Sequence, residues 1–74
     1  MYIIIELQTT NGQTAHIVTT KEDRNEALST FHSILAAAAI SKVDTHTAVV
    51  MDERGNYVAI ESFVHKEEEQ EQEE

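Results

Sequence analysis

The sequence contains no cysteine, and this absence removes a common support of small domains. Disulfide bonds are excluded, and no cysteine and histidine spacing typical of a zinc site is present. A chain of 74 residues has room for one core, and a domain of this size buries only about 60% of the surface that its unfolded chain exposes. We therefore expect association with other subunits, most simply as a homodimer, to supply additional burial.

Basic residues are also scarce. The chain has 5 lysines and arginines against 14 aspartates and glutamates, which gives a net charge of −9. Much of the acid lies in residues 67–74, so the body of the chain is only mildly acidic. A surface that follows nucleic-acid phosphates needs clustered cations, and direct nucleic-acid binding is therefore not expected.

Long hydrophobic runs are absent as well. The N-terminal stretch Met1–Glu6 is apolar for only a few residues and carries no basic n-region, so it is interpreted as a strand and not as a signal peptide. No stretch approaches the roughly 20 apolar residues of a membrane span. We expect no membrane association and take the cytoplasm as the default location.

Motifs of catalysis are missing. The only glycines, Gly12 and Gly55, are explained by turns, so neither belongs to a phosphate-binding loop. The serines have no nucleophile-elbow context, and no carboxylate pair marks a cleft. We expect no enzyme activity and no cofactor.

The four histidines invite a metal hypothesis, which their spacing does not support. No two of them form an H-x-H strand pattern or an i, i+4 helix pair, so no metal site is expected. His16 is predicted to pair with Glu6 across two strands, while strand parity places His46 on the helix side of the sheet and His65 opposite. His32 borders the apolar helix stripe and is an interaction candidate.

The first half of the chain predicts a β-hairpin followed by a helix. Residues 2–8 and 13–20 are rich in β-branched types and flank the strong turn dipeptide Asn11-Gly12. Thr19 or Thr20 is predicted to cap a helix over residues 21–40. Helical spacing then predicts one stripe of core residues: Ala27, Leu28, Phe31, Ile34, Leu35 and Ala38.

A second hairpin follows, with strands at residues 44–51 and 57–64. Gly55 stands where a type I turn with a G1 bulge requires a left-handed residue. The predicted fold class is α+β: a ββαββ domain over residues 1–65, with a four-stranded antiparallel sheet and one helix packed on one face. Residues 66–74 are predicted to be a disordered acidic tail. Such a tail is expected to keep a small domain dispersed. The alternatives are mimicry of nucleic-acid phosphates and electrostatic attraction of a basic partner.

Period-two alternation divides the strand residues between two faces. With three-residue loops in both hairpins, the face under the helix receives Ile3, Ile5, Leu7, Ala15, Ile17, Ala48, Val50, Val58, Ile60 and Val64. The opposite face receives Ile4, Glu6, His16, Val18, Val49, Met51, Tyr57, Glu61 and Phe63. This second face is too apolar to be simply wetted by water, although single exposed hydrophobic residues are common. Its candidate interaction residues are Val49, Met51, Tyr57 and Phe63. A two-residue turn at Asn11-Gly12 would change the assignments in the first hairpin.

Three stretches of the chain, at residues 3–9, 26–39 and 46–50, resemble a group of short uncharacterised proteins of Firmicutes prophages and mobile elements. The resemblance implies a genetic context near phage structural genes and no assigned activity. The leading hypothesis is a non-catalytic accessory protein that self-associates and binds a phage or host protein. One alternative is a binder of a small ligand or signalling nucleotide at a subunit interface, with Arg24, Lys42 or Arg54 contacting phosphate. The other is a virion or tail-assembly component.

Overall fold

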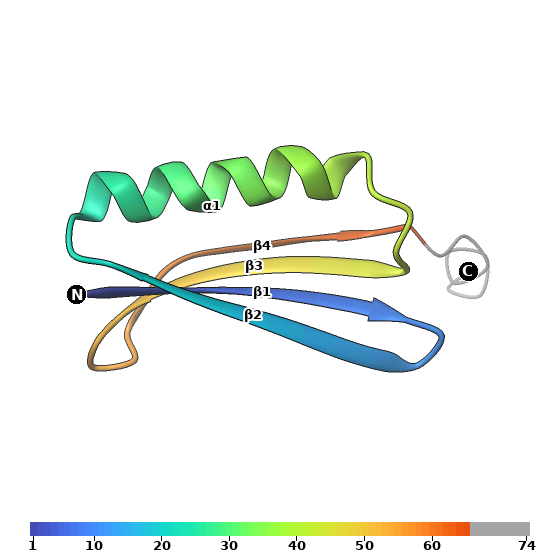
Figure 1. The fold of residues 1–74 in the computed structure, drawn as a ribbon, viewed down its shortest axis with the longest axis horizontal. Helices are drawn as coiled ribbons and strands as arrows, with labels where there is room; N and C mark the ends of the chain where they lie inside the picture. Colours follow the sequence, from blue (N-terminus) through green and yellow to red (C-terminus); the bar gives the residue numbers. More distant parts are fainter. Residues whose placement is uncertain (66–74) are drawn as a thin grey trace.

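A computed structural model describes residues 1–65 as one helix lying on one sheet (Figure 1). The elements are β1 (Tyr2–Thr10), β2 (Gln13–Lys21), α1 (Arg24–Ala39), β3 (Thr45–Asp52) and β4 (Tyr57–Val64). The strands form a single antiparallel sheet in the order β2-β1-β3-β4. The predicted α+β fold is confirmed, and the predicted acidic tail, 66–74, lies outside the described residues.

Helix α1 begins later than the sequence predicts. Its N-cap is Asp23, whose carboxylate accepts a hydrogen bond of 3.1 Å from the backbone N–H of Glu26. Thr19 and Thr20 belong to β2, where they pair with Ile4 and Ile3 of β1. The prediction of a threonine cap was wrong because these β-branched residues extend the strand ladder, for which they are well suited.

The core lies between α1 and the two central strands. Of the predicted stripe, the helix buries Ala27, Phe31 and Ala38, and Ile34 and Leu35 are partly buried against the same core. Leu28 is half-buried and is not part of this core cluster. On the sheet side the cluster contains Ile4 and Val50, both almost fully buried, together with Ala48. The alanines have little side-chain volume, so the helix can lie close to the sheet at these points.

The first hairpin has a two-residue turn. Asn11 and Gly12 have φ values of 54° and 80°, as a type I′ turn requires, and Thr10 pairs with Gln13. The assumption of a three-residue loop was therefore wrong. Ile17 lies opposite Glu6, and the side of β1 beneath the helix carries Ile4 and Glu6.

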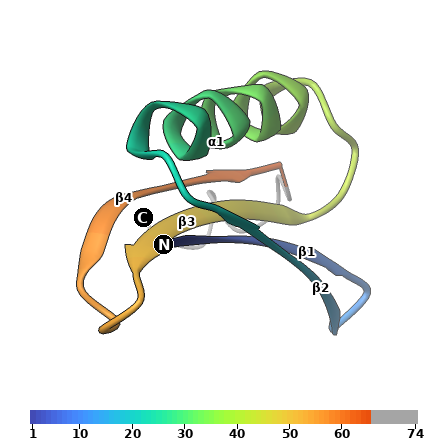
Figure 2. The ribbon, with the colours of Figure 1, turned by 60° about the vertical axis from the view of Figure 1, so that its left-hand side comes forward.

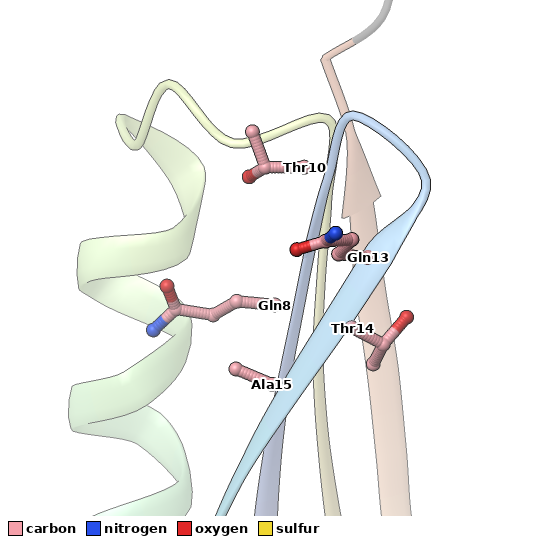
Figure 3. Close-up of a pocket in the computed structure, with 5 residues that line it drawn as sticks. All are labelled: Gln8, Thr10, Gln13, Thr14 and Ala15. Atoms are coloured by element: carbon pink, nitrogen blue, oxygen red, sulfur yellow. The ribbon is translucent and has the colours of Figure 1, made fainter.

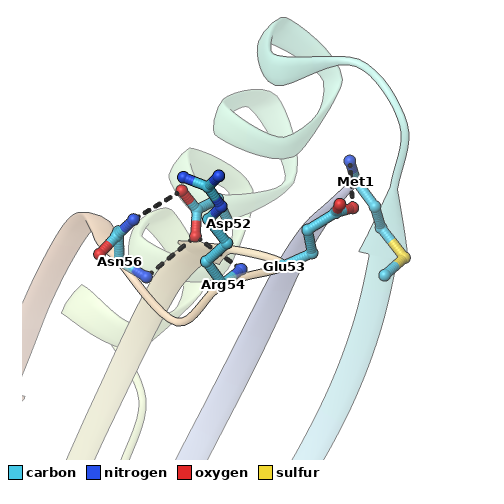
Figure 4. A network of polar contacts seen from close by, with 5 residues as sticks. All are labelled: Met1, Asp52, Glu53, Arg54 and Asn56. Carbon is cyan, nitrogen blue, oxygen red and sulfur yellow. Dashed lines mark hydrogen bonds and ion pairs between the residues drawn. The ribbon is translucent and has the colours of Figure 1, made fainter.

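The second hairpin has the predicted turn. Gly55 has a φ of 90° and donates its N–H to the carbonyl of Asp52 at 3.0 Å. The N–H of Asp52 in turn donates to the carbonyl of Asn56 at 2.9 Å. The Asp52 carboxylate also accepts hydrogen bonds from the backbone N–H groups of Arg54 and Asn56, which fixes the loop (Figure 4).

A β-bulge in β4 follows this turn. Val50 pairs with Ala59 and Met51 pairs with Tyr57, which leaves Val58 as an extra residue. Both Val58 and Ala59 pack against the core. One inserted residue inverts the alternation beyond it. Residues 60–64 of β4 therefore lie on the opposite faces of the sheet to those predicted.

Candidate functional site: the open face of the sheet

One face of the sheet has no layer over it within residues 1–65. Figures 1 and 2 show α1 on the other side, and the remaining described segments are turns and short connections. We call the uncovered side the open face. Cross-strand pairing with β3 places nine apolar residues on it: Ile3, Ile5, Leu7, Val18, Val49, Met51, Tyr57, Ile60 and Val64.

The exposure of these side chains changes from the centre of the open face to its outer strands. Val49 is only 7% exposed, because Ile5 and Ile60 flank it as cross-strand partners. On the outer strands Val18 is 55% exposed, Ile60 57% and Tyr57 69%. The face therefore has a packed centre and a wide apolar margin that meets solvent.

The polar strand residues of the open face are threonines, one serine and one histidine. By the same pairing they are Thr9, Thr14, His16, Thr20, Thr45, Thr47 and Ser62. Among the strand residues within 1–65, no aspartate, glutamate, lysine or arginine lies on this face, although 26% of the whole chain is charged. A large apolar patch without charges is typical of a surface that another molecule covers.

The structure separates the candidate residues into three places. Val49, Met51 and Tyr57 lie on the open face as predicted. Phe63 was placed there wrongly: it pairs with His46, which is buried on the helix side, because the bulge at Val58 inverts the end of β4. His32 is exposed on α1, edge-on to Phe31 at a ring distance of 5.4 Å, and is remote from the open face.

The same corrections apply to the wider face assignments. Ile3, Ile5 and Leu7 were expected beneath the helix and instead lie on the open face, as do Ile60 and Val64. Ile4, Glu6 and Glu61 were expected on the open face and lie on the helix side. The open face is thus more apolar and less charged than the sequence predicted.

A polar cluster beneath the C-terminal end of α1 was not foreseen from the sequence. The carboxylate of Glu6 accepts hydrogen bonds from Nε2 of His46 at 2.6 Å and from the side-chain amide of Gln8 at 2.9 Å. Nδ1 of His46 lies 3.2 Å from the hydroxyl of Ser41. The prediction that His16 pairs with Glu6 was wrong, since His16 is opposite Leu7 and faces the other way.

His65 also belongs to the helix side, contrary to its predicted position. Its Nε2 donates a hydrogen bond of 2.8 Å to the carbonyl of Ala38, and its ring stacks on Phe63 at 6.4 Å. The carbonyl of Ala38 also accepts a hydrogen bond of 3.2 Å from the backbone N–H of Ser41, so His65 is a second donor to the end of α1. In the described part of the chain, no three histidine or carboxylate side chains gather as ligands for a metal ion.

A shallow depression lies beside the first hairpin. It has a volume of about 250 Å³ and is lined by Gln8, Thr10, Gln13, Thr14 and Ala15. Figure 3 shows Gln8 and Ala15 extending toward the side on which the helix lies, whereas Thr14 points away from it. All of the lining residues are uncharged. Arg24, Lys42 and Arg54, which were predicted to contact phosphate, are not among them.

Comparison with known proteins identifies no relative. No protein-family model, curated protein or solved structure matches the chain. Over residues 1–65, no helix has the length and apolar character needed to cross a membrane. The resemblance to uncharacterised prophage proteins therefore stays a prediction.

Proposed function

We propose that this protein is a non-catalytic accessory protein that acts by self-association, with the open face of one copy stacked on the open face of a second. The observation that carries the proposal is the composition of that face. It combines nine apolar residues with uncharged polar ones on a chain that is 26% charged.

The charge distribution favours a second copy as the occupant. A net charge of −9 makes two copies repel each other in general. A two-fold contact places the same patch against itself, so a patch with acidic or basic side chains would create like-charge pairs. In the described part of the chain, no strand position on the open face holds an aspartate, glutamate, lysine or arginine, so the strands create no such pair.

Stacking would also provide the burial that one copy lacks. Two sheets pack face to face about 10 Å apart with interdigitated side chains. The pair would then have two sheets inside and the helices outside. Tyr57, Ile60 and Val64 are among the large exposed apolar side chains, and full burial of such a side chain contributes about 1.5–3 kcal/mol.

The outer surface of this assembly would be free for a partner. Helix α1 would face outward, with the exposed His32 on it. The prophage resemblance makes a phage or host protein the expected partner. A nucleotide-binding function has less support, because Arg24, Lys42 and Arg54 do not line the depression at the first hairpin.

Sedimentation velocity of the variant Ile60→Asp tests the proposal. Ile60 is 57% exposed, so an aspartate there stays hydrated in a single copy but becomes an unpaired buried charge in the stacked pair. Such a charge costs about 3–5 kcal/mol, and we expect association to weaken by about 100-fold or more. Ser29→Asp adds the same charge on the exposed surface of α1 and is the matched control. Equal association of the two variants would refute stacking through the open face.

A further inference from the structure

Strand β2 forms one edge of the sheet and lacks the usual protection of an edge strand. Its residues 13–18 are exposed, and between Gln13 and Thr20 it has no charged side chain, no proline and no glycine. The other edge, β4, contains the bulge at Val58 and the exposed Glu61. Bulges and charges hinder pairing with a further strand, so β2 is the more open edge.

The turn of the first hairpin determines which backbone groups of β2 are free. Thr10 and Gln13 close a two-residue turn and form a hydrogen-bonded pair, and such pairs alternate along an antiparallel ladder. Gln13 and every second residue after it therefore bond to β1. The residues between them direct their N–H and C=O groups outward: Thr14, His16, Val18 and Thr20.

We propose that β2 pairs antiparallel with β2 of a second copy, about a two-fold axis at Ile17. In this register Ile17 lies opposite Ile17 of the other copy, and His16 lies opposite Val18. Residues whose backbone groups point outward in one copy then lie opposite such residues in the other copy. Their N–H and C=O groups therefore form hydrogen-bonded pairs. The two sheets would continue into one through the backbone, whether or not the open faces are stacked.

This register is the one that pairs all nine residues of β2, from Gln13 opposite Lys21 to Lys21 opposite Gln13. It brings no two like charges together. Moving the axis to His16 would set two histidines against each other, and moving it to Val18 would set Thr14 opposite Glu22, beyond the strand.

The exposed side chains of β2 fit the same arrangement. Ile17 is 53% exposed on the helix side, and Val18 is 55% exposed on the open face. At the axis the two isoleucines form a non-hydrogen-bonded pair, the position at which opposing side chains are closest. Cross-strand pairs of β-branched residues stabilise antiparallel sheets.

Single-cysteine cross-linking tests the pairing and its register, because the chain has no cysteine of its own. Paired residues at a non-hydrogen-bonded position have Cα atoms about 4.5 Å apart, which is within the range of a disulfide. We expect Ile17→Cys to form a disulfide-linked dimer under mild oxidation at least ten times faster than Ala15→Cys. Ala15 is exposed on the same side of β2, but in this register the Cα atoms of its two copies are about 14 Å apart.

A mixing experiment checks the register independently. Ala15 of one copy lies opposite Thr19 of the other, so a mixture of Ala15→Cys and Thr19→Cys should cross-link faster than either variant alone. Equal rates for Ile17→Cys and Ala15→Cys, or no cross-link at micromolar concentration, would overturn pairing between copies through β2.

A further variant separates this edge contact from stacking of the open faces. Ile17 does not lie on the open face, so the double variant Ile17→Cys with Ile60→Asp should cross-link as fast as Ile17→Cys alone. Loss of the cross-link in the double variant would show that the edge contact depends on the open face, and would overturn the proposal of a separate interface. The variant Ile17→Lys should weaken edge pairing, because two lysines would then meet at the axis.

Discussion

Nε2 of His46 lies 2.6 Å from the carboxylate of Glu6, and this contact joins the two central strands beneath the end of α1. His46 is 4% exposed, and its other ring nitrogen contacts Ser41. Among the described residues, no buried side-chain nitrogen or oxygen lacks a hydrogen-bond partner. The cluster is therefore a completed polar network within the protein, and loss of one member leaves a buried group unpaired.

We predict that Glu6→Ala lowers the free energy of unfolding by about 1–3 kcal/mol, because His46 then loses its partner in a buried position. Glu61→Ala is the control: Glu61 lies on the same side of the sheet but is exposed, and it should change stability by less than about 0.5 kcal/mol. Urea unfolding at one protein concentration gives both values. Similar losses for the two variants would contradict the role of the cluster.

The corrected faces of β4 predict different effects for two neighbouring residues. Phe63 is half-buried on the helix side and stacks on His65, whereas Val64 is 49% exposed on the open face. Phe63→Ala should lower the stability of the protein by about 2–4 kcal/mol. Val64→Ala should instead weaken association and leave the fold of the single copy intact.

Thermal unfolding and sedimentation, measured on both variants, separate these effects. The opposite result would be weak association with normal stability for Phe63→Ala, and normal association with low stability for Val64→Ala. It would show that the bulge at Val58 does not invert the strand.

The turn of the first hairpin gives a prediction about backbone conformation. Gly12 has a φ of 80°, and an alanine in left-handed backbone conformation costs about 1–2 kcal/mol. Gly12→Ala should therefore destabilise the protein by about that amount in urea unfolding. Asn11→Gly keeps the turn accessible and should be nearly neutral. A neutral Gly12→Ala variant would contradict the type I′ turn.

The Asp52 carboxylate gives a prediction about pH. Hydrogen bonds from Asn56, backbone and side chain, and from the backbone N–H of Arg54 hold the pKa of Asp52 below its ordinary value of 3.8. Because the folded pKa is the lower one, the stabilisation is present above about pH 4 and is lost as the pH falls through the folded pKa.

An NMR titration of the Asp52 carboxyl carbon should therefore give a midpoint below 3.8. Asn56→Ala removes the side-chain hydrogen bond to the carboxylate and should move this midpoint upward. A midpoint at or above 3.8 in the unsubstituted protein would contradict the network at the turn.

The elements of the fold could be predicted from the sequence because their signals are local. The spacing of Ala27, Phe31 and Ala38 identified the buried stripe of α1, and Gly55 identified the second turn. The start of α1 could not be predicted in the same way, because threonines suit both a helix cap and a strand. Asp23 provides the observed cap.

The faces of the sheet could not be predicted because they depend on single-residue events. One residue fewer in the first turn and the extra Val58 in β4 each exchange the two sides of a strand. The alternation of side chains along β1 does not show which of its sides faces the helix, because Ile3, Ile4 and Ile5 make both sides apolar. The contact between Glu6 and His46 joins residues 40 positions apart, and no local pattern marks it.

Native mass spectrometry of the protein purified gently from a bacterial host is the most direct measurement of the central claim, since one spectrum reports both subunit number and bound mass. Stacking of the open faces predicts an assembly with an even number of subunits and no additional mass, reduced in size by Ile60→Asp and not by Ser29→Asp. A monomer at micromolar concentration would contradict self-association. An assembly that retains a small molecule would contradict the proposed function and favour a ligand-binding one.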